Sequence, residues 1–529
     1  MRTWLYIAGA LLALYVRHWV KTSRTRRVHD ALIKQHGCRP PPLLQNQRPF
    51  GVDRLEQIFR ADAESRLMEL FLFHFRQTGY TLKQCFLGTP AYGTVDPANL
   101  EAMLNSRFND FSNGPRRAIT FPMFGDGIFT QDGEAWRHSR KMLQPQLVHR
   151  QYEDLSVFRQ PMDDLLEVLP TGGGVVDLQP LFFRYTLDVT TAFLFGESIR
   201  SLKASEDATK VTFASAFDTA QKWVTKRFRL LDLYWLIGGR EFYQACNHIH
   251  RFADEIIEQN LQKEKATDES DMRYVFLKHV DEQSDDRAAL RGQIINILTA
   301  GRDTTACALS WTLYGLLAPF VSLDVEEANW TRSFHLVRHP SVMAKLQAEI
   351  AELPSGVDGP ITRTDLKNLK YLQNVMKEIL RLYPSVPVNT RTSTTDTVLP
   401  TGGGPDRKSP VFIPKGSAVA YSVYTMHRRP DLYGMDAEVF RPERWEEEMP
   451  LDKDPITQRW GYLPFSGGPR LCLGMDFAQT QAAYTIVRIL QRYPTIKLPA
   501  GETVELTGVE KQTMTLVLQI GEGCKVELQ

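Results

Sequence analysis

One decapeptide near the end of the chain, Phe465-Ser-Gly-Gly-Pro-Arg-Leu-Cys472-Leu-Gly474, constrains the fold more than any other segment. It places a cysteine in a Gly/Pro-rich loop, directly before an apolar periodic stretch that we predict to be a helix over residues 473–493. Its glycines let the backbone turn tightly and approach a flat, bulky group where a Cβ would collide. The helix dipole and Arg470 favour the thiolate form of Cys472, so the loop predicts a stabilised thiolate.

A lone stabilised thiolate in a tight loop suits an axial ligand of haem iron. The alternative is a buried structural cysteine in an ordinary turn. Five positions of the loop match the haem-binding signature of the cytochrome P450 family, so the chain resembles that family. The resemblance implies that Cys472 ligates the iron of haem b, and that the other four matched residues form the cofactor-binding loop. These residues are Phe465, Gly468, Arg470 and Gly474.

Composition excludes some classes of function. The 529 residues include 63 Lys plus Arg against 62 Asp plus Glu, so no overall charge would recruit nucleic acid. Hydrophobic residues make up 43% of the chain, enough for a large core. The six cysteines are scattered, without the spacing of a metal finger, which is typical of a reduced compartment.

The N-terminus carries an uncharged apolar run, residues 4–16. This run is short for a membrane span, which takes about 20 residues; a cleaved signal peptide is the alternative, although no small-residue cleavage site follows. Five Lys or Arg residues lie within residues 17–27, whereas Arg2 alone precedes the run. The positive-inside rule then predicts a single-pass signal anchor over residues 1–20 in the endoplasmic reticulum membrane, with the catalytic domain cytosolic.

A basic, Pro-rich linker over residues 21–49 is expected to hold the body off the lipid bilayer. No composition break divides residues 50–529, which we expect to form one cytochrome P450 catalytic domain.

Strand patterns occur at residues 80–95 and 388–425, the second with a hairpin turn at 401–405. The expected fold is therefore mainly α with a minor β region, a single large haem-thiolate domain behind an N-terminal membrane anchor. Helical periodicity predicts helices over residues 51–76, 134–168, 204–224, 240–264, 286–317, 340–352, 364–382 and 473–493.

The segment Ala300-Gly-Arg-Asp-Thr-Thr305 lies in the middle of the long apolar helix predicted over residues 286–317. A Gly and an Asp in such a helix are costly, and a kink with a satisfied polar pair explains them if they stand alone. The segment also resembles the P450 family's oxygen-activation motif. That resemblance implies that Gly301 leaves room for dioxygen, that Thr304 donates a hydrogen bond there, and that Asp303 relays protons inward.

Glu378 and Arg381 lie one turn apart on the helix predicted over residues 364–382. An ordinary surface ion pair is the plain explanation. With Arg444 they resemble the family's Glu/Arg/Arg network, which fixes the chain behind the haem, so we assign all three a structural role.

Trp136 and Arg140, spaced by four residues, share one helical face. With Arg391 they resemble the family's contacts to the haem propionates. Two histidines, His138 and His427, are alternative iron ligands, but neither has the loop context of Cys472.

A basic cluster combines Arg137, Arg140 and Lys141 with residues 427–429. It fits part of the face that receives an acidic electron donor, while an ordinary solvated basic patch is the alternative. The chain has no flavin or nicotinamide domain of its own. By resemblance, electrons therefore come from NADPH through NADPH-cytochrome P450 reductase, with cytochrome b5 as a further partner.

Several segments resemble the fungal branch of the family that hydroxylates n-alkanes and fatty acids at the chain end, among them residues 108–112, 125–129, 139–146 and 383–391. That resemblance implies a membrane-bound monooxygenase that inserts one oxygen atom from O2 into a C–H bond of a long-chain aliphatic substrate, with terminal hydroxylation expected. The hydrophobic small-molecule substrate would meet an apolar lining. The candidate lining residues are Phe121, Phe124, Ile128, Val388 and Met514.

Other functions remain open at this point. Related sequences oxidise the alkyl part of a polyketide or terpenoid. A haem-thiolate isomerase or dehydratase would rearrange a peroxide without a reductase, although the intact Asp303–Thr304 pair argues against it. A haem sensor or carrier would not be an enzyme at all.

One segment departs from the family pattern. Extra residues, roughly 319–336, separate the helix that ends near residue 317 from the next predicted helix at 340. A surface loop of this length is tolerated energetically. The alternative is a retained intron, because Val321-Ser322 and Ala328-Asn329 are compatible with a fungal donor and branch site; sequencing the spliced transcript distinguishes the two.

Overall fold

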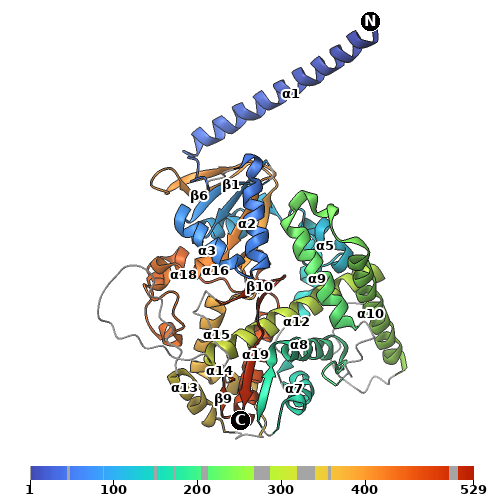
Figure 1. The fold of residues 1–529 in the computed structure, drawn as a ribbon, viewed down its shortest axis with the longest axis vertical. Coiled ribbons are helices and arrows are strands. Elements are labelled where there is room, and N and C mark those ends of the chain that lie inside the picture. Colours follow the sequence, from blue (N-terminus) through green and yellow to red (C-terminus); the bar gives the residue numbers. More distant parts are fainter. Residues whose placement is uncertain are drawn as a thin grey trace.

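The computed structural model describes residues 2–44, 48–86, 88–147, 152–153, 155–171, 173–203, 212–266, 286–317, 340–354, 359–499 and 510–529. Helices dominate these ranges and short strands form small sheets, which confirms the predicted mainly α fold with a minor β region (Figure 1). The helices are α1 (Arg2–Gln35), α2 (Val52–Ala63), α3 (Leu67–Thr78), α4 (Pro97–Glu101), α5 (Arg116–Phe124), α6 (Gly133–Leu143), α7 (Ser156–Val168), α8 (Leu178–Phe195), α9 (Phe213–Arg229), α10 (Gly239–Ala266), α12 (Arg287–Leu317), α13 (Pro340–Ala351), α14 (Arg363–Asn368), α15 (Lys370–Leu382), α16 (Val423–Met426), α17 (Pro430–Tyr433), α18 (Pro455–Trp460) and α19 (Met475–Arg492). The strands are β1 (Thr81–Phe86), β2 (Thr89–Thr94), β3 (Phe111–Ser112), β4 (Gly174–Asp177), β5 (Val388–Ser393), β6 (Thr397–Gly403), β7 (Ser409–Ile413), β8 (Ala418–Ser422), β9 (Ile496–Lys497), β10 (Gln512–Met514), β11 (Leu518–Ile520) and β12 (Lys525–Leu528).

The largest sheet has the strand order β1-β2-β8-β5-β3. Its pairs are antiparallel except β2 with β8, and Arg391 on β5 lies opposite Val419 on β8. Strands β6 and β7 form a separate antiparallel hairpin. The loop between them, residues 404–408, overlaps the turn predicted at 401–405, so the predicted hairpin is confirmed.

Helix α12 crosses the middle of the body (Figure 1). Asp286 caps it, because its Oδ1 accepts hydrogen bonds from the N–H groups of Ala288 at 2.9 Å and Ala289 at 3.3 Å. Gly301 lies at a point where α8 approaches α12 closely, since a Cβ there would lie 2.5 Å from Thr190 Oγ1. The helix stays regular through Gly301. The glycine therefore allows α8 to pack closely against α12, and its expected role in leaving room for dioxygen stays a prediction.

The sequence patterns did not predict α8. Most of its side chains are buried, including the polar residues Thr186, Asp188 and Thr190. A helix buried on all sides presents no amphipathic stripe, so periodicity could not mark it.

Three predicted helices each correspond to two separate helices in the structure. Apolar spacing continues across such breaks, so periodicity alone does not reveal them. The predicted start of one further helix, residues 204–211, lies outside the described residues, and the observed helix α9 begins at Phe213. The divided predictions are 51–76 into α2 and α3, 134–168 into α6 and α7, and 364–382 into α14 and α15.

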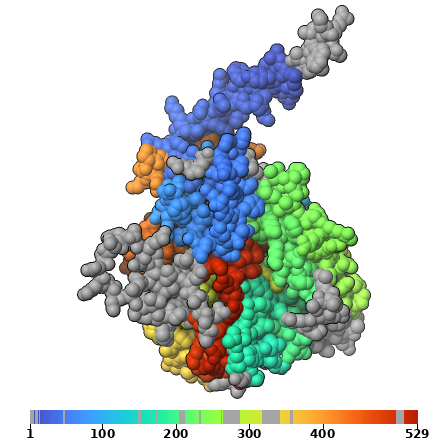
Figure 2. Space-filling model, viewed as in Figure 1, coloured from blue at the N-terminus to red at the C-terminus, as the bar shows by residue number. Residues whose placement is uncertain are grey.

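Helix α1 continues through much of the segment predicted as a linker, residues 21–49, and most of it extends away from the body (Figures 1 and 2). Near its C-terminal end, His29 contacts the body, with its Nε2 3.3 Å from Asp396 Oδ2. The chain after it is fixed to the body: Arg39 N–H donates to Pro410 O at 2.8 Å, and Leu44 N–H donates to Lys83 O at 2.9 Å. In the part of the chain that the structure describes, no helix combines the length and the apolar character needed to cross a bilayer. The structure therefore does not support the single-pass anchor predicted over residues 1–20.

Candidate active site

The loop of Cys472 is held in shape by its own backbone. Cys472 N–H donates to Phe465 O at 3.0 Å, and Leu471 N–H donates to Gly468 O at 3.0 Å. Gly468 has φ +64°, and a Cβ there would lie 2.0 Å from Leu104 O. Glycine is therefore required at this position both for the backbone conformation and for the close approach.

The Cys472 side chain is not enclosed by the protein. It is exposed, although the protein around it removes enough water to raise the pKa of its thiol, an effect opposed by the Gly474 N–H and the Arg140 charge. A Cβ on Gly474 would meet nothing within 4 Å. The thiol and the glycine thus face open space at the start of α19.

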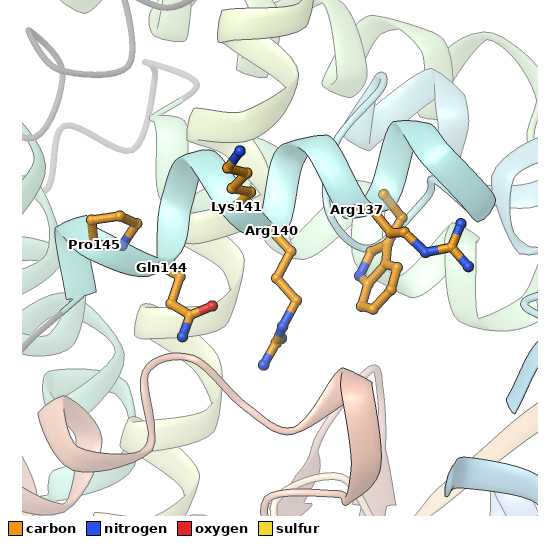
Figure 3. A pocket seen from close by; sticks show the side chains of 6 residues that line it. Arg137, Arg140, Lys141, Gln144 and Pro145 are labelled. Carbon is orange, nitrogen blue, oxygen red and sulfur yellow. The ribbon is translucent and has the colours of Figure 1, made fainter. Parts of the chain in front are cut away.

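Arginines gather beside this loop. Arg140 extends from α6 toward the loop (Figure 3), where its Nη1 donates to Leu471 O at 3.0 Å. The Arg470 guanidinium lies 4.4 Å from the ring centroid of the buried Trp136. On β5, the buried Arg391 donates to Asn389 Oδ1 at 3.1 Å. The structure therefore brings together the predicted residues Trp136, Arg140, Arg391 and Arg470.

A fourth arginine, Arg116 at the start of α5, joins this cluster, although the sequence analysis missed it. Its Nη2 donates at 2.5 Å to Asn389 Oδ1, the same atom that Arg391 uses. Burial, together with the Arg391 charge, lowers the pKa of Arg116 to about 10. No local motif marks Arg116, because its role depends on β5, which lies far away in the sequence.

The cluster of Arg116, Arg140, Arg391 and Arg470, here called the arginine cluster, has an excess of positive charge. Among the described residues, the ion pair between this cluster and a carboxylate joins Arg470 Nη2 to Asp132 Oδ1 at 2.7 Å. Burial lowers the pKa of Arg470 to about 9, and the Arg391, Arg116 and Arg140 charges act in the same direction. A cofactor with two carboxylates would relieve this repulsion, so the residues fit the propionates of haem.

Two cavities adjoin α6. One, of about 460 Å³, is lined by Trp136, Arg137, Arg140, Lys141, Gln144 and Pro145 (Figure 3). The other, of about 370 Å³, lies between α6 and α12, and His138 and Gln293 contribute to its lining. The exposed residues Arg137 and Lys141 thus border a hollow near the arginine cluster.

The basic face predicted from residues 427–429 is wrong. His427, Arg428 and Arg429 are buried. His427 packs in the core, where its Nε2 accepts from Leu463 N–H at 2.9 Å, and Arg428 Nη1 donates to Leu382 O at 2.5 Å. Backbone carbonyls accept hydrogen bonds from Arg428 and Arg429, and Arg429 also pairs with Asp431. A run of basic residues in a sequence gives no sign of such partners.

Asp303 and Thr304 lie on different faces of α12. Asp303 is buried and accepts hydrogen bonds from Arg302 Nη1 at 2.9 Å and from Gln221 Nε2. Burial raises the pKa of Asp303 to about 6, while Arg302 and Gln221 act in the opposite direction. Thr304 is partly exposed, and its hydroxyl donates to Ala300 O at 2.7 Å.

Glu378 sits between Arg381 and Arg444, and all three side chains are fully buried. Glu378 Oε1 accepts from both guanidiniums at 2.8 Å, and Oε2 accepts from Trp445 Nε1 at 3.1 Å. Burial alone raises the pKa of Glu378, but the two arginines together outweigh it and lower the pKa. The network joins α15 to residues 436–445.

The five predicted substrate residues lie in different environments. Phe121 is 42% exposed and carries the Arg117 guanidinium 4.7 Å from its ring centroid, whereas Phe124 belongs to the buried core. Ile128, Val388 and Met514 are partly buried and pack against that core. Two residues of α9 contact this region. Gln221 donates to Asp303, and Arg229 donates to the Met514 carbonyl. No sequence motif singled out either residue.

A mainly helical body, with a cysteine loop and an arginine cluster suited to haem, defines the class of haem-thiolate enzymes. A family model described as Cytochrome P450 matches residues 58–319 and 334–518, so the chain belongs to the cytochrome P450 family. The break between the two matched ranges coincides with the extra segment noted in the sequence, whose residues lie outside those described.

Fungal relatives agree with this assignment. A cytochrome P450 of Arthroderma benhamiae is 40% identical over 99% of both chains, and cytochrome P450 52A12 of Debaryomyces hansenii is 40% identical over 88% of both. Cytochrome P450 52A6 of Candida tropicalis is 37% identical over 92% of this chain and 90% of its own. The predicted resemblance to a fungal branch of the family is confirmed.

The crystal structure of the cytochrome P450DA heme domain has the same fold, with a TM-score of 0.71 at 20% identity over 93% of this chain and 97% of that one. Membership of the family makes the chain a monooxygenase with haem, a cysteine thiolate ligand, and electrons delivered from NADPH by a reductase.

Proposed function

We propose that the protein inserts one oxygen atom from O2 into a C–H bond of a long-chain alkane or fatty acid, with attack at the chain end. The observation that carries this proposal is the arginine cluster beside the Cys472 loop, where four guanidiniums gather and Asp132 forms an ion pair with Arg470. The aliphatic substrate class is supported by the fungal branch that the sequence resembles and by the apolar character of the candidate lining residues.

Each part of the site has a distinct task in this proposal. Cys472 would provide the thiolate ligand of the haem iron, while Trp136 and the arginine cluster would hold the two propionates. Phe465, Gly468 and Gly474 would form the loop that the cofactor approaches closely. When bound, haem supplies the activation of dioxygen. Thr304 holds a proton at Oγ1 in a hydrogen bond to Ala300 O, and rotation about its side chain would turn that proton away from the helix. Asp303, with a pKa of about 6, can take up and release a proton near neutral pH.

We also place the protein at the endoplasmic reticulum membrane, with the catalytic body in the cytosol and contact to the lipid bilayer. Exposed apolar side chains support this placement. On α1 they include Leu11, Leu12 and Trp19, and on the short helix η6 (Leu231–Leu236) they include Trp235 and Leu236. Exposed apolar side chains on a helix, with tryptophan among them, favour binding at a membrane interface. Cell fractionation of the full chain against a W235S/L236S variant tests it: release of the variant into the soluble fraction is expected, and equal membrane fractions would contradict a role for η6.

The decisive experiment incubates the full-length holoenzyme with NADPH-cytochrome P450 reductase, NADPH and a mixture of alkanes and fatty acids. Mass spectrometry then identifies the products. Terminal alcohols or diacids are expected. A normal reduced carbon monoxide spectrum without any aliphatic product would reject this substrate class and favour the alkyl part of a polyketide or terpenoid.

Two variants test the proposed roles. Cys472→Ala should lose the thiolate band of the carbon monoxide complex, whereas Cys85→Ala, at a partly exposed cysteine on β1, should keep it. Thr304→Ala should keep the band but divert NADPH into peroxide. Thr299→Ala is its matched control, because Thr299 also donates to the carbonyl four residues earlier, Ile295 O at 2.8 Å. Equal coupling in Thr304→Ala and Thr299→Ala would remove Thr304 from proton delivery.

A further inference from the structure

Helix α9 reaches Asp303 through two contacts. Gln221 on α9 donates its Nε2 hydrogen to Asp303 Oδ2. Arg302 donates to Asp303 Oδ1 through Nη1 and to Asp218 Oδ1, on α9, through Nη2, both at 2.9 Å. The Asp218 side chain is 51% exposed, whereas those of Arg302 and Asp303 are 3% and 1% exposed. One arginine therefore links a surface carboxylate to a buried one.

Arg302 is fixed rather than free to swing. Its guanidinium lies 4.9 Å from the ring centroid of Phe183 on α8 and 5.1 Å from that of Phe217 on α9. The Arg302 backbone carbonyl accepts from Thr186 Oγ1 on α8 at 2.7 Å. Because the Arg302 guanidinium is fixed, it holds the Asp218 and Asp303 carboxylates at a set separation. A displacement of α9, which carries Asp218, would therefore change the surroundings of Asp303.

Helix α9 also touches the segments proposed to line the substrate site. Near its end, Arg227 Nε donates to Ile119 O on α5 at 3.1 Å, and Arg229 Nη2 donates to Met514 O on β10 at 3.2 Å. A ligand that displaces α5 or β10 will therefore act on the helix that holds Asp303.

We propose that Gln221 and the Asp218–Arg302 pair are positioning residues through which α9 sets the proton affinity of Asp303 and thereby couples substrate binding to proton supply. This inference rests on the proposed role of Asp303 in proton delivery. Asp218, Gln221 and Arg302 touch no reacting atom, and they act through the Asp303 carboxyl.

The charged and titratable groups that face Asp303 are few among the described residues. From α12 they are Arg302 and Cys307, and from α9 Asp218; α8 contributes the neutral side chains of Phe183 and Thr186. The Gln221 hydrogen bond favours the carboxylate form, whereas the Asp218 charge disfavours it. Loss of Gln221 and loss of the Asp218 charge should therefore shift the titration of Asp303 in opposite directions.

The test compares Gln221→Leu and Asp218→Asn in the full-length holoenzyme. Infrared titration follows the protonated-carboxyl band of Asp303, which is identified by its loss in Asp303→Asn. We expect the midpoint to rise by about one pH unit in Gln221→Leu, since a hydrogen bond to a charged group is removed. In Asp218→Asn it should fall by a smaller amount, because solvent screens the half-exposed Asp218. Shifts of the same sign, or none in either variant, would overturn the proposal.

Peroxide released per NADPH, measured against pH with and without a bound fatty acid, provides the second readout. The pH at which coupling changes should move with the infrared midpoint of each variant. Unchanged coupling in Asp303→Asn would refute proton delivery by Asp303 itself. Uncoupling in Asp303→Asn, with wild-type pH profiles in both α9 variants, would instead reject only the control by α9. Because Asp218 is half exposed, Asp218→Asn gives an answer even where Gln221→Leu folds poorly.

Discussion

Glu378 and Arg116 differ in how far neighbouring groups compensate their charges. Glu378 has two guanidiniums and a tryptophan N–H for its two oxygens, so its charge is fully compensated. Arg116 shares one neutral amide oxygen with Arg391 and has no carboxylate among its hydrogen-bond partners in the described chain. Arg116 is partly buried, and a charge without compensation in such a place costs stability until a ligand of opposite charge binds. The removal of Arg116 should therefore affect the apoprotein and the holoprotein differently.

Arg116→Leu should leave the apoprotein as stable as the wild type or more stable, because one of four mutually repelling cations is removed. The same change should weaken haem retention by roughly tenfold, the equivalent of one charge-assisted hydrogen bond. Thermal midpoints of apoprotein and holoprotein, together with haem transfer to an acceptor globin, measure both effects. Arg117→Leu is the control, since Arg117 is exposed and paired with Asp126; equal haem loss in both variants would contradict the assignment.

The raised pKa of Asp303 predicts that the free energy of unfolding depends on pH. Its pKa is raised to about 6 in the folded protein, above the value of about 3.9 expected in the unfolded chain. The folded state therefore prefers the protonated form, and this contribution is fully present below about pH 4 and is lost as the pH rises to about 6. The loss is on the order of 3 kcal/mol. Asp303→Asn should abolish it, which unfolding free energies between pH 4 and 8 would reveal as a flatter profile; parallel profiles would contradict the buried titration.

At the scale of elements, the pairing of α8 with α12 depends on Gly301. A Cβ at this position would lie 2.5 Å from Thr190 Oγ1 and 3.0 Å from Thr190 Cγ2. Thr190 is buried, and its hydroxyl donates to Thr186 O at 2.7 Å, so it cannot rotate away without losing that bond. The contact is a tightly packed one in which a single methyl group must displace its neighbour.

Gly301→Ala should therefore destabilise the protein by about 1–3 kcal/mol, despite the better helix propensity of alanine. Thr190→Ala in the same chain should restore most of the loss, because the colliding atoms are gone. A double-mutant cycle by chemical unfolding measures this coupling. Additive losses in the cycle would show that the two residues do not meet.

The elements also show what sequence patterns could predict. The Cys472 loop, α12 and α19 were predictable because turn residues and apolar spacing mark them locally. Helix α8 was not, since it is buried on every side, and the breaks between α2 and α3 and between α14 and α15 leave the apolar spacing intact. At the candidate site, Trp136, Arg140, Arg391 and Arg470 came from a family resemblance. Arg116 and Gln221 could not be found in this way, because each depends on contact with an element distant in the sequence.

For the whole molecule, the Glu378 network ties α15 to the chain that follows β8. Breaking a fully buried charge network by removing one partner leaves the others uncompensated. Glu378→Gln should lower the free energy of unfolding by about 3–5 kcal/mol and reduce the yield of haem-loaded protein. Lys345→Ala is a matched control at the exposed Lys345–Glu443 pair, where the expected change is within about 1 kcal/mol. Similar losses in both variants would show that burial of the network does not matter.

The attachment of α1 has a mechanical consequence. A flexible chain of the same 34 residues would have an end-to-end distance of roughly 30 Å and would often fold back onto the body. As a continuous helix it spans about 50 Å, and its stem is fixed by the hydrogen bonds of residues 39–44. Helix α1 therefore acts as a stiff arm and not as a flexible linker. A surface that binds its N-terminal end would fix the distance and the tilt at which the catalytic body meets its electron donor.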